Sequence, residues 1–232
     1  MLEQLRKNVC EANKMLVKYR LVMFSNGNVS GLDRKTGYIA IKPSGIDYSI
    51  LTPQDIVIVD SNGNIIEGDL NPSVDLPTHI EMYKAFPEIG GVVHTHSKWA
   101  TIWAQAGENI PPFGTTHADD FYGEIPCTRI MKQFEVEENY EYNTAKVIIE
   151  VLQKKMRNIV KTPAVLVRNH GPFVWGEDCF AAVKKSVILE QVAEMAWRVR
   201  DVQGECIEYM PRDLMDKHFF RKNGNNAYYG QK

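Results

Sequence analysis

The feature that most constrains the fold is the segment 90–96, Gly-Gly-Val-Val-His-Thr-His, in which an apolar run ends in two histidines separated by one residue. A β-branched run bounded by glycine is typical of a buried strand. Because side chains alternate between the faces of a strand, His94 and His96 point to one side and Thr95 to the other. The pair is therefore either half of a metal site or two unrelated polar residues at a strand end.

The first third of the chain is predicted to be one helix followed by antiparallel strands. Apolar residues at alternating spacings of four and three from Leu5 to Tyr19 predict an amphipathic helix. Strands are then expected at 29–33, 38–41, 56–60 and 64–67. Asn62-Gly63 lies between the last two, and this dipeptide is a strong hairpin signal because both turn positions favour a positive φ.

The rest of the chain alternates helices with buried strands. Helices are predicted near 76–86, 99–105, 143–156 and 177–203, and a second buried strand at 164–167. Asp75 is expected to cap the helix that Pro77 opens. Residues 113–129 are aromatic and irregular, and the tail from Asn223 has no core periodicity. With no repeat or long linker, residues 1–232 are predicted to form one α/β domain.

Composition narrows the function classes. A formal net charge of −2 gives no basic field for nucleic acid. No apolar stretch is as long as a membrane span, and the N-terminus lacks the apolar core of a signal peptide. The four cysteines, Cys10, Cys127, Cys179 and Cys206, are widely spaced, which favours reduced thiols in a cytoplasmic protein over disulfides or a zinc–thiolate site.

Two further residues are candidates to complete a metal site with His94 and His96. His170 follows the predicted strand 164–167, and Asp75 precedes a helix. Three imidazoles and a carboxylate suit a catalytic zinc, although manganese, cobalt or nickel fit the same ligands. The alternative is that His170 merely caps a turn and Asp75 merely caps a helix. The other three histidines, which lack such spacing, are not expected to be ligands: His79, His117 and His218.

Seven ordered motifs carry a family likeness. They are Asn-Gly-Asn-Val-Ser at 26–30, Lys-Pro-Ser-Gly at 42–45, Ser-Val-Asp-Leu-Pro-Thr-His at 73–79, His-Thr-His-Ser at 94–97, Thr-His-Ala-Asp at 116–119, Arg-Asn-His-Gly at 168–171 and Tyr-Tyr-Gly-Gln at 228–231. With these motifs the sequence resembles the L-ribulose-5-phosphate 4-epimerases of the class II aldolase and epimerase superfamily. The resemblance implies a three-layer α/β/α sandwich around a mixed, mainly antiparallel sheet, assembled as a fourfold-symmetric homotetramer.

The resemblance also implies roles for individual residues. It assigns a divalent metal, zinc, to Asp75, His94, His96 and His170. It assigns contacts with the phosphorylated ketopentose to Gly27, Asn28, Lys42, Ser44, Gly45 and Ser73. It assigns acid and base catalysis to Asp119 and Tyr229, with the tail 223–232 reaching a neighbouring subunit's site, and adds His218 and Arg221 as substrate contacts from that neighbour. Only the register of the 116–119 motif selects Asp119 over Asp120.

The expected reaction is 4-epimerisation of L-ribulose 5-phosphate to D-xylulose 5-phosphate by cleavage and rejoining of the C3–C4 bond, in arabinose or ascorbate breakdown. A sugar-phosphate aldolase that releases the fragments, or a non-catalytic relative, is the alternative. Aldolases of the superfamily tend to carry glutamate where this chain has Asp75, which favours the epimerase.

Overall fold

The computed structural model describes residues 2–154, 158–204, 207–224 and 227–230. Its strands are β1 (Asn28–Asp33), β2 (Tyr38–Ile41), β3 (Val57–Val59), β4 (Ile65–Glu67), β5 (Gly91–His94), β6 (Ala164–Val167) and β7 (Gly171–Gly176). Its helices are α1 (Leu2–Lys18), α2 (Leu76–Ala85), α3 (Lys98–Ala106), α4 (Thr115–Ala118), α5 (Gln133–Glu137), α6 (Tyr140–Lys154), α7 (Cys179–Gln203) and α8 (Arg212–Lys222), with a 3₁₀ turn, η1 (Pro53–Asp55).

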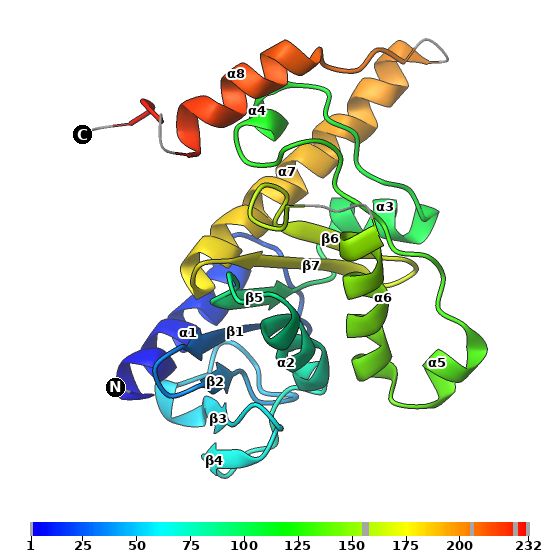
Figure 1. Cartoon of the computed structure of the whole chain (residues 1–232). Helices are drawn as coiled ribbons and strands as arrows, with labels where there is room; N and C mark the ends of the chain where they lie inside the picture. The colour runs from blue at the N-terminus through cyan, green and yellow to red at the C-terminus, as the bar shows by residue number, and fades with distance from the viewer. Residues whose placement is uncertain (1, 155–157, 205–206, 225–226, 231–232) are drawn as a thin grey trace.

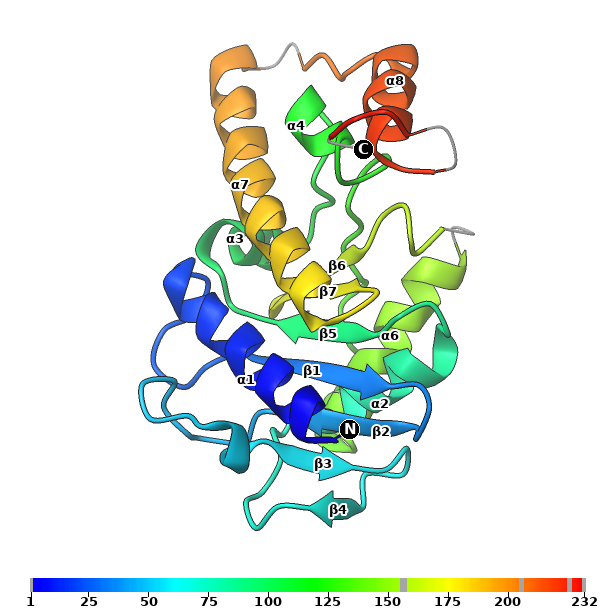
Figure 2. The same cartoon turned by 90° about the vertical axis from the view of Figure 1, so that its left-hand side faces the viewer.

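The strands form one sheet in the order β4-β3-β2-β1-β5-β7-β6 (Figures 1 and 2). Every pairing between these strands is antiparallel. Parallel pairing in the described residues is limited to an isolated bridge between Cys127 and Leu166, so the expected mixed character is confined to that bridge. The predicted α/β class is confirmed.

Alternation along the strands produces two cores, one on each face of the sheet. In β5, Val93 packs into the core shared with α1, α3 and α7, while Val92 packs into the core shared with α2 and α6. Figure 2 shows α1 and α7 on one side of the sheet and α2 and α6 on the other. The three expected layers are therefore present, with the histidine strand β5 near the middle.

The glycines that precede the histidines allow a close approach between β5 and the start of α7. A Cβ at Gly91 would clash with the backbone of Asp178 and Cys179, and one at Gly90 would clash with that of Glu177. Asp178 caps α7 by accepting from the backbone N–H of Ala181 at 2.8 Å. Glycine is required here for space, and the first turn of α7 fixes where β5 begins.

Two elements differ from what the sequence predicts. β7 is a central strand, although Gly171-Pro172 is typical of a turn; its proline lies at the second residue of the strand. The helix α8 lies just before the irregular tail, in a segment where the sequence gives no helix signal, and only Phe219 is buried in it. The C-terminal half of α7, with α4 and α8, extends beyond the sheet (Figures 1 and 2). None of the described helices is long and apolar enough to cross a membrane.

Candidate metal centre and substrate pocket

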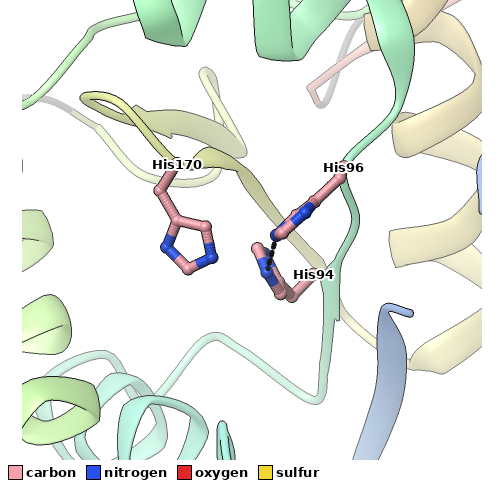
Figure 3. A group of neighbouring side chains, drawn as sticks. All are labelled: His94, His96 and His170. Carbon is pink, nitrogen blue, oxygen red and sulfur yellow. Dashed lines mark hydrogen bonds between the residues drawn. The ribbon is translucent and has the colours of Figure 1, made fainter. Parts of the chain in front are cut away.

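Three imidazoles from two neighbouring segments of the sheet face a common space (Figure 3). His94 ends β5, His96 follows two residues later, and His170 lies in the turn between β6 and β7. One ring nitrogen from each lies within 4.8 Å of the others. The sequence separates His170 from the pair by more than 70 positions, and the adjacency of β5 and β7 brings the three together.

The surroundings of His94 fix which of its nitrogens is free. Its Nδ1 lies 3.0 Å from the carbonyl oxygen of Pro172, and because a carbonyl only accepts, Nδ1 carries the proton. The ring also stacks on Phe173, with centroids 4.2 Å apart. The Nε2 lone pair of His94 therefore points at Nε2 of His96, 3.1 Å away. A shared cation satisfies two such lone pairs, so this geometry fits a metal.

The two other imidazoles are held in the neutral form that binds metals. Burial lowers the pKa of His170 to about 3, and the neighbouring imidazoles of His94 and His96 add to this shift. Burial also lowers the pKa of His96, with His94 as the second cause. Neither ring needs to lose a proton at neutral pH before it ligates a cation.

Asp75 lies beside the imidazoles, but it is not the helix cap that the sequence predicts. Its side chain accepts no hydrogen bond from the first turn of α2. Instead its carboxylate accepts from Asn28 Nδ2 at 2.7 Å, and Asn28 also donates to Ser73 Oγ at 3.0 Å. The carboxylate is thus turned from the helix toward β1, where it lines the same cavity as the histidines.

The cavity has a volume of about 400 Å³. It brings together ten residues proposed from the sequence, which are Gly27, Asn28, Lys42, Ser44, Gly45, Ser73, Asp75, His94, His96 and His170. Tyr140 and Glu141, at the start of α6, complete part of its wall. Sequence reasoning missed Tyr140, whose hydroxyl lies 3.3 Å from Nδ1 of His170, because nothing in the spacing connects these two residues.

Lys42 is the unusual member of this lining, since only 1% of it is exposed. Its Nζ donates to the carbonyl oxygens of Ser25 at 3.4 Å and Pro43 at 3.3 Å. No carboxylate in the described residues forms an ion pair with it. Burial lowers its pKa, opposed by the charge of Asp47. A buried ammonium with only carbonyl partners suits an anionic ligand in this cavity.

The remaining candidates form a second cluster, which does not line the cavity. Asp119, at the end of α4, accepts from His218 Nδ1 at 3.0 Å and from Arg221 and Lys222 in α8. The guanidinium of Arg221 lies over the ring of Tyr229, 5.2 Å from its centroid. The structure therefore joins all four candidates of this group, namely Asp119, His218, Arg221 and Tyr229. Asp120 instead pairs with Lys185 at 2.8 Å.

The hydrogen bonds to Asp119 carry a prediction about pH. Burial acts to raise the pKa of Asp119, but the hydrogen bonds from Arg221, His218 and Lys222 outweigh it, and the net shift is downward. A depressed folded pKa stabilises the docked α8 above the unfolded value of about 3.9, and this stabilisation is lost as the pH falls through the lowered folded pKa. At pH 7 we expect Asp119→Asn to speed hydrogen exchange of the α8 amides about 10-fold.

At a pH near 3 the Asp119→Asn variant and the wild type should exchange α8 amides at increasingly similar relative rates. The control is Asp201→Asn, which changes an exposed carboxylate of α7. Equal exchange in wild type and Asp119→Asn at pH 7 would show that the carboxylate does not hold α8.

Two histidines outside these clusters have structural partners. Nδ1 of the fully buried His79 lies 2.7 Å from Ser30 Oγ. Nε2 of His117 donates to the carbonyl oxygen of Gly123 at 2.7 Å. Neither belongs to the group of imidazoles that could hold a metal.

Comparison with known proteins identifies the family. The family described as "Class II Aldolase and Adducin N-terminal domain" matches residues 7–197. The chain belongs to this family. As a class II aldolase-family protein it is expected to be a metal-dependent enzyme, and its histidine group could bind a divalent metal. The match ends before α8, so the cluster around Asp119 lies only partly within it.

Solved structures share this fold over most of the chain. An L-fuculose 1-phosphate aldolase has 26% identity and a TM-score of 0.77, covering 93% of this chain and 94% of its own. The L-fuculose 1-phosphate aldolase of Glaciozyma antarctica PI12 has 18% identity and a TM-score of 0.76, covering 97% and 84%. That of Thermus thermophilus has 23% identity and a TM-score of 0.68, covering 88% and 99%. At these two lower identities the likeness concerns the fold alone.

Proposed function

We propose that the protein catalyses metal-dependent 4-epimerisation of L-ribulose 5-phosphate to D-xylulose 5-phosphate. The observation that carries this proposal is one cavity with three imidazoles on one side and the buried Lys42 ammonium on another. Such a cavity suits a phosphorylated sugar that chelates a cation. The seven sequence motifs that resemble the epimerases support this substrate. A cytoplasmic location and a role in arabinose or ascorbate breakdown belong to the same proposal.

The chemistry requires bond cleavage, because the hydrogen at C4 of the substrate is not acidic while the carbonyl is at C2. Breaking the C3–C4 bond instead places the charge on the oxygens of a dihydroxyacetone fragment. A divalent cation, when bound, stabilises that charge as a Lewis acid. We assign zinc as this cation, with manganese, cobalt or nickel as substitutes, and His94, His96, His170 and Asp75 as the residues that hold it.

The phosphate of the second fragment needs a fixed anchor while its aldehyde turns over. We assign this anchor to Lys42, with hydroxyl, amide and backbone groups of Asn28, Ser44 and Ser73 and of the loops at Gly27 and Gly45. Lys42 lies buried on the cavity wall, and Asn28 links the anchor to Asp75 through a 2.7 Å hydrogen bond. The fragment then stays near the metal residues while it rotates.

Proton transfer falls to Asp119 and Tyr229. During cleavage a base takes the proton of the C4 hydroxyl, and during rejoining an acid returns a proton to the new C4 oxygen on the opposite face. Two proton-transfer groups are therefore needed, each contributing about 10²–10⁴ in rate. Arg221 contacts both groups and, with His218, would hold them around the substrate.

Since Asp119 does not line its own chain's cavity, we assign this cluster to the cavity of a neighbouring copy. A surface that contacts a different surface on the next copy closes into a ring when the rotation closes. We propose a homotetramer of this kind, in which α8 and residues 223–232 complete the next subunit's site. The described part of that tail folds back on α8, with the backbone N–H of Tyr229 donating to the carbonyl of Arg221 at 2.9 Å.

The test is to incubate the purified, zinc-loaded protein with L-ribulose 5-phosphate and to measure D-xylulose 5-phosphate with a coupled transketolase assay. We expect the ketose to form without accumulation of free fragments. Glycolaldehyde phosphate and dihydroxyacetone as the net products would instead identify an aldolase, the second candidate. That candidate is favoured by the L-fuculose 1-phosphate aldolase at 26% identity. No turnover in either assay would contradict both.

A further inference from the structure

Tyr48 lies between the two ends of the cavity, although it is not itself part of the lining. Only 4% of the residue is exposed. Its hydroxyl donates to the carbonyl oxygens of Gly27 at 2.7 Å and Asn26 at 3.0 Å. One hydroxyl proton is thus shared between two consecutive carbonyls, which fixes the backbone of the loop before β1.

The aromatic ring of Tyr48 holds the other partner. The Nζ atom of Lys42 lies over this ring, 4.8 Å from its centroid. The two carbonyl contacts of that ammonium, at 3.3 and 3.4 Å, are long for hydrogen bonds to a charged donor. The negative face of the ring is therefore a main determinant of where the cation sits in this dry environment.

The loop that the hydroxyl holds is packed directly against the metal strand. Gly27 has a φ of +79°, and a Cβ there would lie 2.9 Å from the carbonyl oxygen of His94 and 2.8 Å from Cγ1 of Val22. The next residue, Asn28, donates to Asp75. A shift of this loop would therefore displace the residues around the imidazoles.

We propose that Tyr48 is a positioning residue that sets the separation between the Lys42 ammonium and the histidine group. This separation selects sugar phosphates whose phosphate and chelating oxygens are the right distance apart. The inference rests on the proposed function, because it takes the anion at Lys42 to be the substrate phosphate. The hydroxyl fixes the loop, the ring fixes the cation, and both act through other residues rather than on the substrate.

The test compares two variants of the zinc-loaded protein. Tyr48→Phe keeps the ring under Lys42 and removes only the hydroxyl, whereas Tyr48→Leu removes both. The matched control is Tyr38→Phe, since Tyr38 lies in β2 of the same sheet and its hydroxyl has no hydrogen-bond partner in the described residues. For each protein, the Kd of inorganic phosphate is measured by calorimetry, zinc content by atomic absorption, and folding by thermal unfolding.

We expect Tyr48→Phe to bind inorganic phosphate about 10-fold more weakly and Tyr48→Leu about 100-fold more weakly, with zinc content unchanged. KM for L-ribulose 5-phosphate should rise by similar factors. The preference for this pentulose phosphate over a hexulose 6-phosphate should narrow in both variants. Tyr38→Phe should match the wild type in every measurement. If Tyr48→Leu fails to fold, Tyr48→Phe carries the comparison alone.

Two outcomes distinguish this proposal from the function on which it rests. If the wild type binds phosphate and Tyr48→Phe binds it equally well, with unchanged KM and unchanged preference, Tyr48 does not position the anchor. If the wild type itself binds no phosphate while zinc is present, the anion site at Lys42 is wrong, and the proposed substrate fails with it.

Discussion

Replacing His96 with alanine is expected to weaken zinc binding by more than about 100-fold and to reduce turnover to background. His96 contributes one of the three converging imidazoles, and its Nε2 lies 3.1 Å from that of His94. The backbone fold should persist, because His96 lies just beyond the end of β5 and is not part of either hydrophobic core. Zinc affinity is measured by competition with a chromogenic chelator, and folding by circular dichroism.

The matched control for this loss is His218→Ala. That variant removes an imidazole from the Asp119 cluster, so it should lower activity while zinc affinity stays at the wild-type value. Retention of zinc by His96→Ala at wild-type affinity would contradict the proposed ligand set, whatever its activity.

Tyr229→Phe is expected to reduce epimerisation by about 10²–10⁴ with zinc fully retained. The phenol is the only group removed, and it lies in the cluster around Asp119 rather than among the imidazoles. Removal of the chain after Asn223 should have the same effect. Activity is followed by xylulose phosphate formation, and zinc by atomic absorption. Full activity in the truncated protein would exclude a role for Tyr229.

The sharper form of this experiment mixes two inactive proteins. If the cavity of one subunit is completed by the tail of the next, His96→Ala and Tyr229→Phe subunits co-assembled in equal amounts should regain about a quarter of wild-type activity. That fraction corresponds to the junctions that pair an intact cavity with an intact tail. Mixed oligomers that stay inactive would contradict a site shared between copies.

The histidine strand and the two-layered helices were predictable because their periodicity records burial. Val92 and Val93 lie in opposite cores, as strand alternation requires. The four apolar residues expected to face inward on α2 are indeed buried, namely Leu76, Ile80, Tyr83 and Phe86. These patterns are local, so a single sequence carries them.

What could not be predicted depends on contacts between distant segments. β7 begins Gly171-Pro172, and local turn chemistry gives no sign that Pro172 lies in a central strand whose carbonyl accepts from His94. The carboxylate of Asp75 is turned from its helix by Asn28, a partner 47 residues away. Tyr48 is another such case, because its role depends on Lys42 and on a loop that precedes it by about 20 residues.

The strand β7 supports two of the three imidazoles, since it follows His170 directly and holds His94 through the Pro172 carbonyl and the Phe173 ring. A one-residue insertion or deletion in this hairpin would invert the facing of every β7 side chain and disrupt both histidines together. Descendants of this chain that abandon metal chemistry should therefore do so by exchanging individual imidazoles, while the hairpin keeps its length.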